Sequence, residues 1–321
     1  MDLLQFDNII KTSKNILILS HINPDGDTLG SMCGLYSAIL DNHKKKAEML
    51  LMSELPEVYD FLPYIKNAKN LKEYDKSREY DLVINVDVAS YDRMFDSEPL
   101  FKKAKNTINI DHHITNDSYA DFNYLNPNAS STGEVLYYML EGLKWKISKS
   151  TAINLYTAIL TDTGSFKYSN TTAKAFEASS KLVELGASPI EIYKNCYESN
   201  SKAHFMFQTY CLNNTNFSDD NKIAYTVVYK KDVERFNVAD DCTEGLAEKL
   251  RAIKTVEVSF IVKELAAALS KISMRSEKLD VSEICSKYGG GGHKLAAGCL
   301  IKANPAKAAE KIVQEIKNRL L

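Results

Sequence analysis

The sequence predicts an α/β fold: an N-terminal doubly wound, mainly parallel sheet, followed by a smaller α+β domain. Three observations support this prediction. Short apolar runs alternate with segments of helical spacing in the N-terminal part of the chain, which is the pattern of a parallel sheet. Histidines and aspartates come directly after several of these runs. A polar, turn-rich stretch at residues 213–221 then precedes a second group of apolar runs.

Four apolar runs in the N-terminal region are predicted to be strands. They cover residues 15–20, 47–52, 81–88 and 107–110, and their length and apolar content are typical of buried strands. Residues 29–40, between the first two runs, show the spacing of a helix. Because parallel strands are joined by crossovers, which are usually helices, this alternation favours a parallel sheet.

The region that follows is predicted to be helical. Ser131 and Glu134 have the spacing of a capping box in front of an apolar segment. Further helices are predicted over residues 151–160, 172–185 and 200–212. We therefore expect the first domain to cover residues 1–212, including this helical connector.

The second domain is predicted to cover residues 213–321. Its strands are expected at residues 223–229, 255–262 and 266–274, and an amphipathic helix over residues 304–320. Strands grouped ahead of a terminal helix indicate an α+β domain of ordinary size.

Composition and charge are those of an ordinary soluble globular protein. The chain has 321 residues, of which 45% are hydrophobic and 26% charged, and its net charge is −2. A chain without basic character is not expected to bind long duplex nucleic acid. The sequence has no apolar stretch long enough for a membrane helix and no leader, so we expect a cytoplasmic protein without a membrane partner. Its six scattered cysteines predict buried free thiols rather than disulfides or a zinc site.

Potential metal ligands follow the first predicted strand. His21, Asp25 and Asp27 are close in sequence, and Pro24 and Gly26 favour a turn that directs both carboxylates to one side of a loop. The carboxyl ends of parallel strands meet at one edge of the sheet, where such folds bind ligands. The alternative is that the two aspartates are only turn residues or helix caps.

A second group of potential ligands follows later strands. Asp111, His112 and His113 end the fourth run, Asp87 ends the third, and Asp162 follows a helical segment. Carboxylates combined with imidazoles favour manganese, cobalt or zinc over magnesium alone. The pattern predicts two metal ions at one edge of the sheet, with Asp87 placed to bridge them, and metal-assisted hydrolysis. We expect Asp111 to orient His112. The alternatives are a pair of loop histidines and, for Asp162, an aspartate at a helix end.

The second domain contains a candidate anion site. Four consecutive glycines precede His293, and such a segment exposes backbone N–H groups that a phosphate can approach. The alternative is a flexible linker, but the small residues at 296–298 indicate a packed segment. Arg275 ends a strand-like run and could hold a phosphate through two hydrogen bonds, or it is an ordinary surface arginine.

These motifs resemble those of the DHH phosphoesterase family. Asp111-His112-His113 is similar to its name-giving motif, and the segment from Gly289 to His293 resembles the signature of the DHH-associated C-terminal domain. The compact two-domain layout is similar to the nanoRNase/pAp-phosphatase branch of this family. Within residues 163–172, Lys167 stands where that branch is expected to have arginine.

The resemblance implies roles for the matching residues. Two divalent ions, expected to be Mn²⁺, would be held by His21, Asp25 and Asp87 and by Asp27, Asp87, His112 and Asp162. His113 would contact the scissile phosphate, with Asp111 and Asp87 completing the catalytic set. The substrate's other phosphate or terminal nucleotide would be bound by Arg275, Ser276, Gly291, Gly292 and His293.

The resemblance also implies an activity. We expect hydrolysis of short RNA oligonucleotides to mononucleotides and removal of the 3′-phosphate of adenosine 3′,5′-bisphosphate (pAp) to give AMP, in a cleft between the domains. One alternative is a standalone phosphodiesterase of cyclic or linear di-adenylate. Another is a non-catalytic nucleotide-binding protein, although the complete set of ligands argues against it. The oligomeric state is left open, with a homodimer as one candidate.

Overall fold

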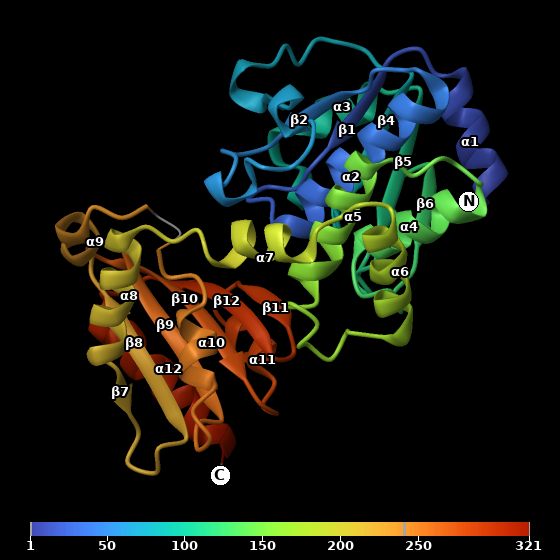
Figure 1. Cartoon of the computed structure of the whole chain (residues 1–321). Helices are drawn as coiled ribbons and strands as arrows, with labels where there is room; N and C mark the ends of the chain where they lie inside the picture. Colours follow the sequence, from blue (N-terminus) through green and yellow to red (C-terminus); the bar gives the residue numbers. More distant parts are fainter. Residues whose placement is uncertain (1, 240–241, 321) are drawn as a thin grey trace. The chain divides into compact units, whose positions relative to one another are not determined.

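The computed structural model describes residues 2–239 and 242–320, and the chain forms two compact units (Figure 1). The units are Met1–Ser199 and Asn200–Leu321. This division lies before helix α8 (Lys202–Asn213), whereas the sequence places the domain boundary after that helix. The difference arises from packing, because Phe207 and Cys211 of α8 belong to a core cluster of the second unit.

The first unit contains a fully parallel sheet, as predicted. Its strands are β1 (Ile16–Leu19), β2 (Glu48–Leu51), β3 (Lys69–Asn70), β4 (Leu82–Val86), β5 (Asn106–Asp111) and β6 (Phe122–Leu125). They are arranged in the order β3-β2-β1-β4-β5-β6, and every neighbouring pair is parallel. The strand order reverses between β1 and β4, which is the position where doubly wound sheets bind their ligands.

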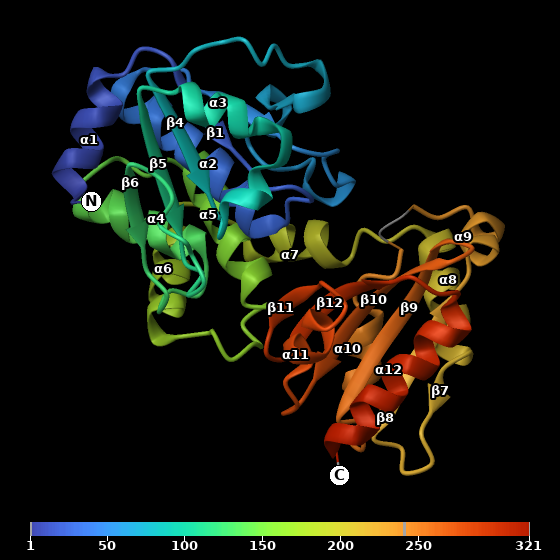
Figure 2. The same cartoon turned by 180° about the vertical axis from the view of Figure 1, so that it is seen from behind.

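Helices cover both faces of this sheet (Figures 1 and 2). They are α1 (Leu3–Thr12), α2 (Gly26–His43), α3 (Glu98–Lys103), α4 (Thr132–Gly142), α5 (Lys149–Asp162), α6 (Ala173–Glu184) and α7 (Pro189–Tyr197). Short 3₁₀ turns lie at Glu57–Tyr59, Ile65–Asn67, Leu71–Glu73 and Tyr91–Ser97. One face packs against α1, α2, α4 and α5, and the other packs against α3.

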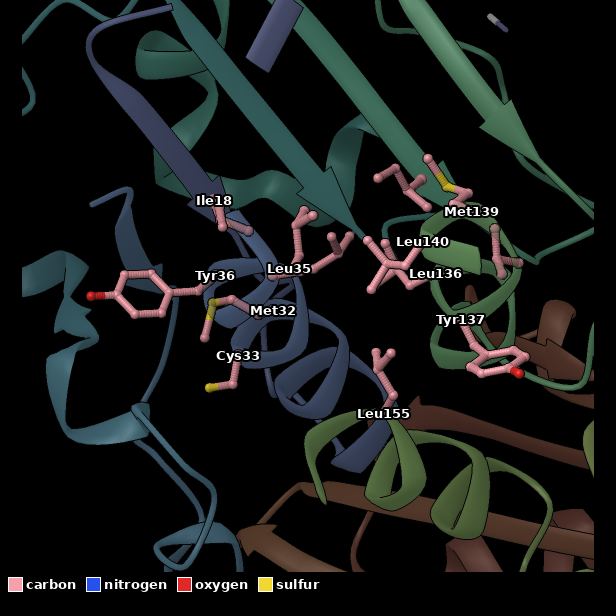
Figure 3. Packing of buried hydrophobic residues seen from close by; sticks show 14 of the residues in the cluster. Ile18, Met32, Cys33, Leu35, Tyr36, Leu136, Tyr137, Met139, Leu140 and Leu155 are labelled. Atoms are coloured by element: carbon pink, nitrogen blue, oxygen red, sulfur yellow. The ribbon is translucent and has the colours of Figure 1, made fainter. Parts of the chain in front are cut away.

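Three of these helices pack tightly under the carboxyl edge of the sheet. Leu35 of α2, Leu136 of α4 and Leu155 of α5 are fully buried in one cluster (Figure 3). Gly133 of α4 faces α5 so closely that a Cβ atom there would lie 2.4 Å from the Cβ of Ala158. The first turn of α4 is thereby held against α5, and Gly26 in the first turn of α2 likewise faces Thr161 of α5.

The second unit is built on a mixed sheet. Its strands are β7 (Asn216–Phe217), β8 (Ile223–Val228), β9 (Val258–Ala266), β10 (Leu269–Ser276), β11 (Gly291–His293) and β12 (Ala296–Ile301), in the order β11-β12-β10-β9-β8-β7. β8 and β9 are parallel, and the other pairs are antiparallel. The stretch at residues 213–221 forms β7 and a turn of this unit.

Helices also cover this second sheet from both sides (Figures 1 and 2). They are α8, α9 (Lys230–Phe236) and α10 (Leu246–Arg251) on one face and α11 (Val281–Ser286) and α12 (Pro305–Leu320) on the other. None of the six cysteines, all of which lie in the described ranges, forms a disulfide, and five of them are buried, whereas Cys196 is partly exposed. No helix in the described part of the chain is long and apolar enough to cross a membrane.

Candidate metal centre and active site

The predicted ligands of the first unit gather at the carboxyl edge of its sheet. His21 follows β1, Asp87 follows β4 and Asp111 is the last residue of β5. Because β1, β4 and β5 are adjacent and parallel, these three residues lie side by side at the point where the strand order reverses.

One group of ligands consists of His21, Asp25 and Asp87, whose ligand atoms lie within 4.8 Å of one another. Nε2 of His21 is 3.5 Å from Oδ2 of Asp87. The other ring nitrogen, Nδ1, lies 2.7 Å from the carbonyl oxygen of Ile22. Since a carbonyl only accepts, Nδ1 carries the proton and Nε2 is the nitrogen that can bind a metal. Asp25 also caps α2, accepting from the N–H of Thr28 at 3.0 Å, so the cap and the ligand interpretations are compatible.

A second group consists of Asp27, His112 and Asp162, again within 4.8 Å of one another. Nε2 of His112 is 3.7 Å from Oδ2 of Asp27 and 3.6 Å from Oδ2 of Asp162. Its Nδ1 lies 3.3 Å from the carbonyl oxygen of Ala129, which fixes the same tautomer as in His21. Asp162 is the last residue of α5, so it is both a helix-end aspartate and a member of this group.

Asp87 joins the two groups. Its Oδ1 is 3.8 Å from Nε2 of His112, and its Oδ2 faces His21. Thr28 of α2 donates a hydrogen bond to Oδ2 at 2.6 Å, and Thr132 of α4 donates to Oδ1 at 3.2 Å. The backbone of Asp87 has a φ of 61°, a left-handed conformation that costs a non-glycine residue about 1–2 kcal/mol. The surrounding structure therefore holds this carboxylate in place at a cost in stability.

Asp27 is held by the start of a helix. Its carboxylate accepts hydrogen bonds from the backbone N–H groups of Thr132 at 2.8 Å and Gly133 at 2.9 Å, in the first turn of α4. Ser131 caps the same helix, accepting from the N–H of Glu134, as the capping-box pattern predicts.

The electrostatics of the cluster indicate uncompensated negative charge. Burial raises the pKa of Asp27 well above its usual value, and the neighbouring carboxylates of Asp87 and Asp162 raise it further. Burial and Asp87 likewise raise the pKa of Asp162. The pKa of Asp87 is lowered despite burial, because the imidazoles of His21, His113 and His112 favour its charged form when they are protonated. Buried carboxylates that repel one another, combined with oriented imidazole nitrogens, form a donor set that suits divalent cations.

Three of the five predicted substrate residues of the second unit, Arg275, Gly291 and His293, occupy positions on one face of its sheet, whereas Gly292 lies opposite the buried Ala297. Arg275 of β10 is opposite Ala296 of β12, which is in turn opposite His293 of β11. Gly291 is opposite Gly298 in the same arrangement. Ser276 is not brought to this face. Its side chain is almost fully buried and its hydroxyl donates to the carbonyl of Leu279.

Arg275 already has partners within its own unit. Its Nε donates to Glu248 at 2.7 Å and its Nη1 to the carbonyl of Met274 at 2.8 Å. These bonds fix the plane of the guanidinium group. The side chain remains about one-third exposed.

The glycine-rich segment is a strand edge and not a flexible linker. A Cβ atom on Gly290 would lie 2.2 Å from the carbonyl oxygen of Gly298, and one on Gly292 would lie 2.5 Å from that of Ala296. These two glycines are required by the approach of β12. A Cβ atom on Gly291 would meet nothing within 4 Å, so packing does not explain why this position is glycine.

The sequence comparisons match this layout. The pattern described as "DHH family, N-terminal domain" matches residues 15–161, and that of the "DHHA1 domain" matches residues 220–320. A probable bifunctional oligoribonuclease and PAP phosphatase NrnA from Streptococcus mutans is 32% identical over 313 residues, which covers 97% of this chain and 96% of the relative. The chain belongs to the DHH family. DHH phosphoesterases are metal-dependent, and the acidic cluster of this family member could bind metal.

Other DHH-family relatives extend over most of the chain. The bifunctional oligoribonuclease and PAP phosphatase NrnA of Bacillus subtilis is 28% identical and covers 89% of both chains. A crystal structure of an exopolyphosphatase-related protein from Bacteroides fragilis superposes with a TM-score of 0.93 at 25% identity, covering 98% of this chain and 95% of the other. The same two-unit architecture is thus present in an experimental structure.

The DHH motif itself differs from one expectation. Asp111 hydrogen-bonds to the ring of His113 rather than to that of His112: its Oδ1 lies 2.7 Å from Nδ1 of His113. The link to His112 is only through that residue's backbone N–H. Burial would lower the pKa of His113, but this hydrogen bond and the nearby carboxylate of Asp87 outweigh it and raise the pKa to about 9.

Sequence reasoning missed several residues that support the DHH site. The sequence patterns single out neither Thr28 nor Thr132, although their hydroxyls hold Asp87. Asn116 donates to Asp111, and Asn170 donates to Asp162. Lys167, in the position where arginine was expected, is exposed and follows three left-handed residues at 164–166. Only the proximity of these residues to the motifs could have suggested their roles.

Proposed function

We propose that this DHH protein hydrolyses short RNA oligonucleotides to mononucleotides and removes the 3′-phosphate of pAp to give AMP, using two divalent ions, with Mn²⁺ as the expected metal. The observation that carries the proposal is the position of Asp87, which faces both ligand groups with a different carboxylate oxygen. The names of relatives of similar length provide independent support for the substrates.

The residues of the first unit provide the hydrolytic chemistry. Divalent ions bound to these carboxylates and imidazoles would supply an acidified water and charge for the phosphoryl oxygens. Asp111 holds the Nδ1–H of His113, so that Nε2 is the atom through which His113 contacts the scissile phosphate. Thr28 and Thr132 keep the carboxylate of Asp87 in one orientation, which limits reorganisation during the reaction.

The residues of the second unit bind the part of the substrate that does not react. Arg275 and His293 lie on either side of Ala296 on one face, and both can donate hydrogen bonds to a phosphate. The open backbone at Gly291 allows a ligand to approach closely. Binding energy from this remote contact can increase turnover as well as affinity.

A parallel assay tests the proposal. Purified protein with Mn²⁺ is offered pAp, RNA dimers to pentamers, linear and cyclic di-adenylate, and pyrophosphate. We expect AMP from pAp and mononucleotides from the RNA. Hydrolysis of di-adenylates alone would instead support a standalone di-adenylate phosphodiesterase. Nucleotide binding without turnover, in the presence of Mn²⁺, Mg²⁺ or Co²⁺, would show a non-catalytic protein.

A further inference from the structure

Two cysteines of the second unit lie next to each other in its core. Cys285 is in α11 and Cys299 is in β12, and both belong to one cluster of buried side chains. The thiol of Cys285 donates a hydrogen bond to the sulfur of Cys299. It also lies 3.6 Å from Sδ of Met274 in β10. Among the described residues, neither thiol belongs to a group that could hold a metal ion, so the pair has no part in the metal centre.

The hydrogen bond makes the two thiols chemically unequal. It lowers the pKa of Cys299 by more than burial raises it, and it raises the pKa of Cys285, which burial raises further. Attack on an oxidant requires the thiolate. Cys299 is therefore the sulfur that reacts first, and Cys285 is the neighbour that can resolve the product. At Cys33 and Cys196, by contrast, burial raises the pKa and keeps the thiol protonated.

A small oxidant has access to Cys299 but not to Cys285. Cys299 is 6% exposed, whereas Cys285 has no exposed surface. Cys299 is also among the residues that line a hollow of about 710 Å³, together with Gly290 and Gly298. Because these two glycines have no side chains, only main chain borders the approach to the sulfur at this point.

The backbone around the pair allows the two sulfurs to be joined. The N–H of Gly290 donates to the carbonyl of Cys285 at 3.0 Å, and a Cβ atom at Gly290 would lie 2.5 Å from Cβ of Cys299. The missing side chain lets α11 and β12 pack directly against each other. A disulfide needs this closeness, since its two Cβ atoms are about 3.5–4.5 Å apart.

We propose that Cys285 and Cys299 form a reversible oxidative modification site, at which a peroxide converts the two thiols into a disulfide. The bridge connects α11 to β12 and encloses the glycine-rich segment at residues 289–292. The inference goes beyond the proposed function and does not depend on it, because both sulfurs lie in the second unit and neither is a metal ligand.

The reaction has two steps. The thiolate of Cys299 attacks one peroxide oxygen, so that an S–O bond forms, the O–O bond breaks, and the departing hydroxide takes up the proton that Cys299 released. The sulfur of Cys285 then attacks the sulfenic acid at Cys299. The S–S bond forms, the S–O bond breaks, and the hydroxyl group leaves as water with the proton of Cys285. Two thiols are oxidised, and the peroxide is reduced to two molecules of water.

The test treats the full-length protein with a small molar excess of hydrogen peroxide and counts thiols after unfolding in acid. Of the six thiols, two should be lost, and dithiothreitol should restore them. Peptide mapping by mass spectrometry should find Cys285 joined to Cys299, and the protein should remain a single chain on a non-reducing gel. A bridge through any other cysteine, a sulfoxide at Met274 as the main product, or the retention of all six thiols would overturn the proposal.

Two variants separate the roles of the sulfurs. In Cys285→Ser, Cys299 should stop at the sulfenic acid, which dimedone traps; no adduct at Cys299 would overturn its assignment as the reacting sulfur. Cys196→Ser is the matched control, because it removes the partly exposed thiol and should form the same bridge at the wild-type rate. Loss of the bridge in this control would show that oxidation follows exposure instead. The mapping of the wild-type protein does not depend on the stability of either variant.

Discussion

Asp87 combines three unusual properties at a single position. It is almost fully buried, its backbone is left-handed, and both of its carboxylate oxygens accept hydrogen bonds from threonines of different helices. A strained, buried carboxylate with both oxygens fixed is preorganised for binding cations.

Replacing Asp87 by alanine should remove a shared ligand. We expect Asp87→Ala to reduce turnover on pAp and RNA by more than about 100-fold, since changes in the outer shell alone cost metal sites 10–100-fold. Calorimetric titration with Mn²⁺ should show fewer than two ions bound. Thr28→Val serves as the graded control: it keeps the ligand but releases one carboxylate oxygen, and should weaken Mn²⁺ binding by a smaller factor. Two tightly bound ions in Asp87→Ala would rule out the bridging position.

The pairing of His113 with Asp111 predicts a pH effect in the metal-free protein. His113 has a raised pKa of about 9, so its charged form stabilises the fold fully below about pH 6.5, the unfolded value. That contribution is lost as the pH rises through about 9. In Asp111→Asn, the NMR titration midpoint of His113 should move down toward 6.5, and the alkaline loss of stability should diminish. An unchanged midpoint would show that Asp111 does not hold this ring.

At the scale of elements, the strands and helices with strong apolar patterns could be predicted. β1, β4 and α2 coincide with runs whose residues are nearly all buried, so their hydrophobicity reports directly on their environment. β6 was missed because all four of its residues are only half-buried. The hairpin of β9 and β10 turns between Ala266 and Leu269, later than the sequence indicates, because Lys263 and Glu264 interrupt the apolar run of β9 before the strand ends.

Some residues of the candidate site could likewise be predicted from their place after a strand, whereas others depend on contacts that the sequence does not show. His21, Asp87 and His112 could be predicted because each follows a strand at the ligand-binding edge. Ser276 could not be excluded from sequence, since its orientation depends on where β10 ends and on the carbonyl of Leu279. The role of Thr132 could not be predicted either, because the residue it contacts lies 45 positions away in the chain.

The contact between α4 and α5 provides a test of how these helices support the metal ligands. An exposed glycine-to-alanine change within a helix normally stabilises it by about 1 kcal/mol. Gly133→Ala should instead destabilise the protein by about 1–3 kcal/mol, because the new Cβ would overlap Ala158. Gly142→Ala in the same helix is the matched control, since its Cβ would meet only the tip of the Leu3 side chain. Urea unfolding of both variants measures the difference. A Gly133→Ala protein as stable as the control would show that this contact adapts easily.

The net charge of −2 is the sum over the whole chain, and it includes two regions whose local charges have opposite signs. The first unit gathers carboxylates for cations, whereas the second presents lysines and Arg275 on one sheet face. A protein with this distribution can bind short anionic substrates without a long basic surface.

If the second unit binds only the part of the substrate that does not react, a change there should affect a minimal phosphodiester and an RNA dinucleotide differently. His293→Ala removes a remote contact, so hydrolysis of bis(p-nitrophenyl) phosphate should be reduced less than hydrolysis of an RNA dinucleotide. Steady-state kcat/KM values for both substrates, measured with Mn²⁺, give the comparison. Equal losses on the two substrates would place His293 among the groups that act on the reacting phosphate.

The wide spacing of the metal ligands along the chain has a consequence for synthesis. The first ligand is residue 21 and the last is residue 162, and β1 must pair with β4 before either group is complete. At about 5–20 residues per second, a ribosome makes the intervening segment in roughly 7–28 s. During that interval the group of His21, Asp25 and Asp87 can assemble once β4 has emerged, whereas the group of Asp27, His112 and Asp162 stays incomplete. The second group could therefore bind an ion only once the first unit has left the ribosome nearly whole, and metal bound there would stabilise the finished fold without assisting its early intermediates.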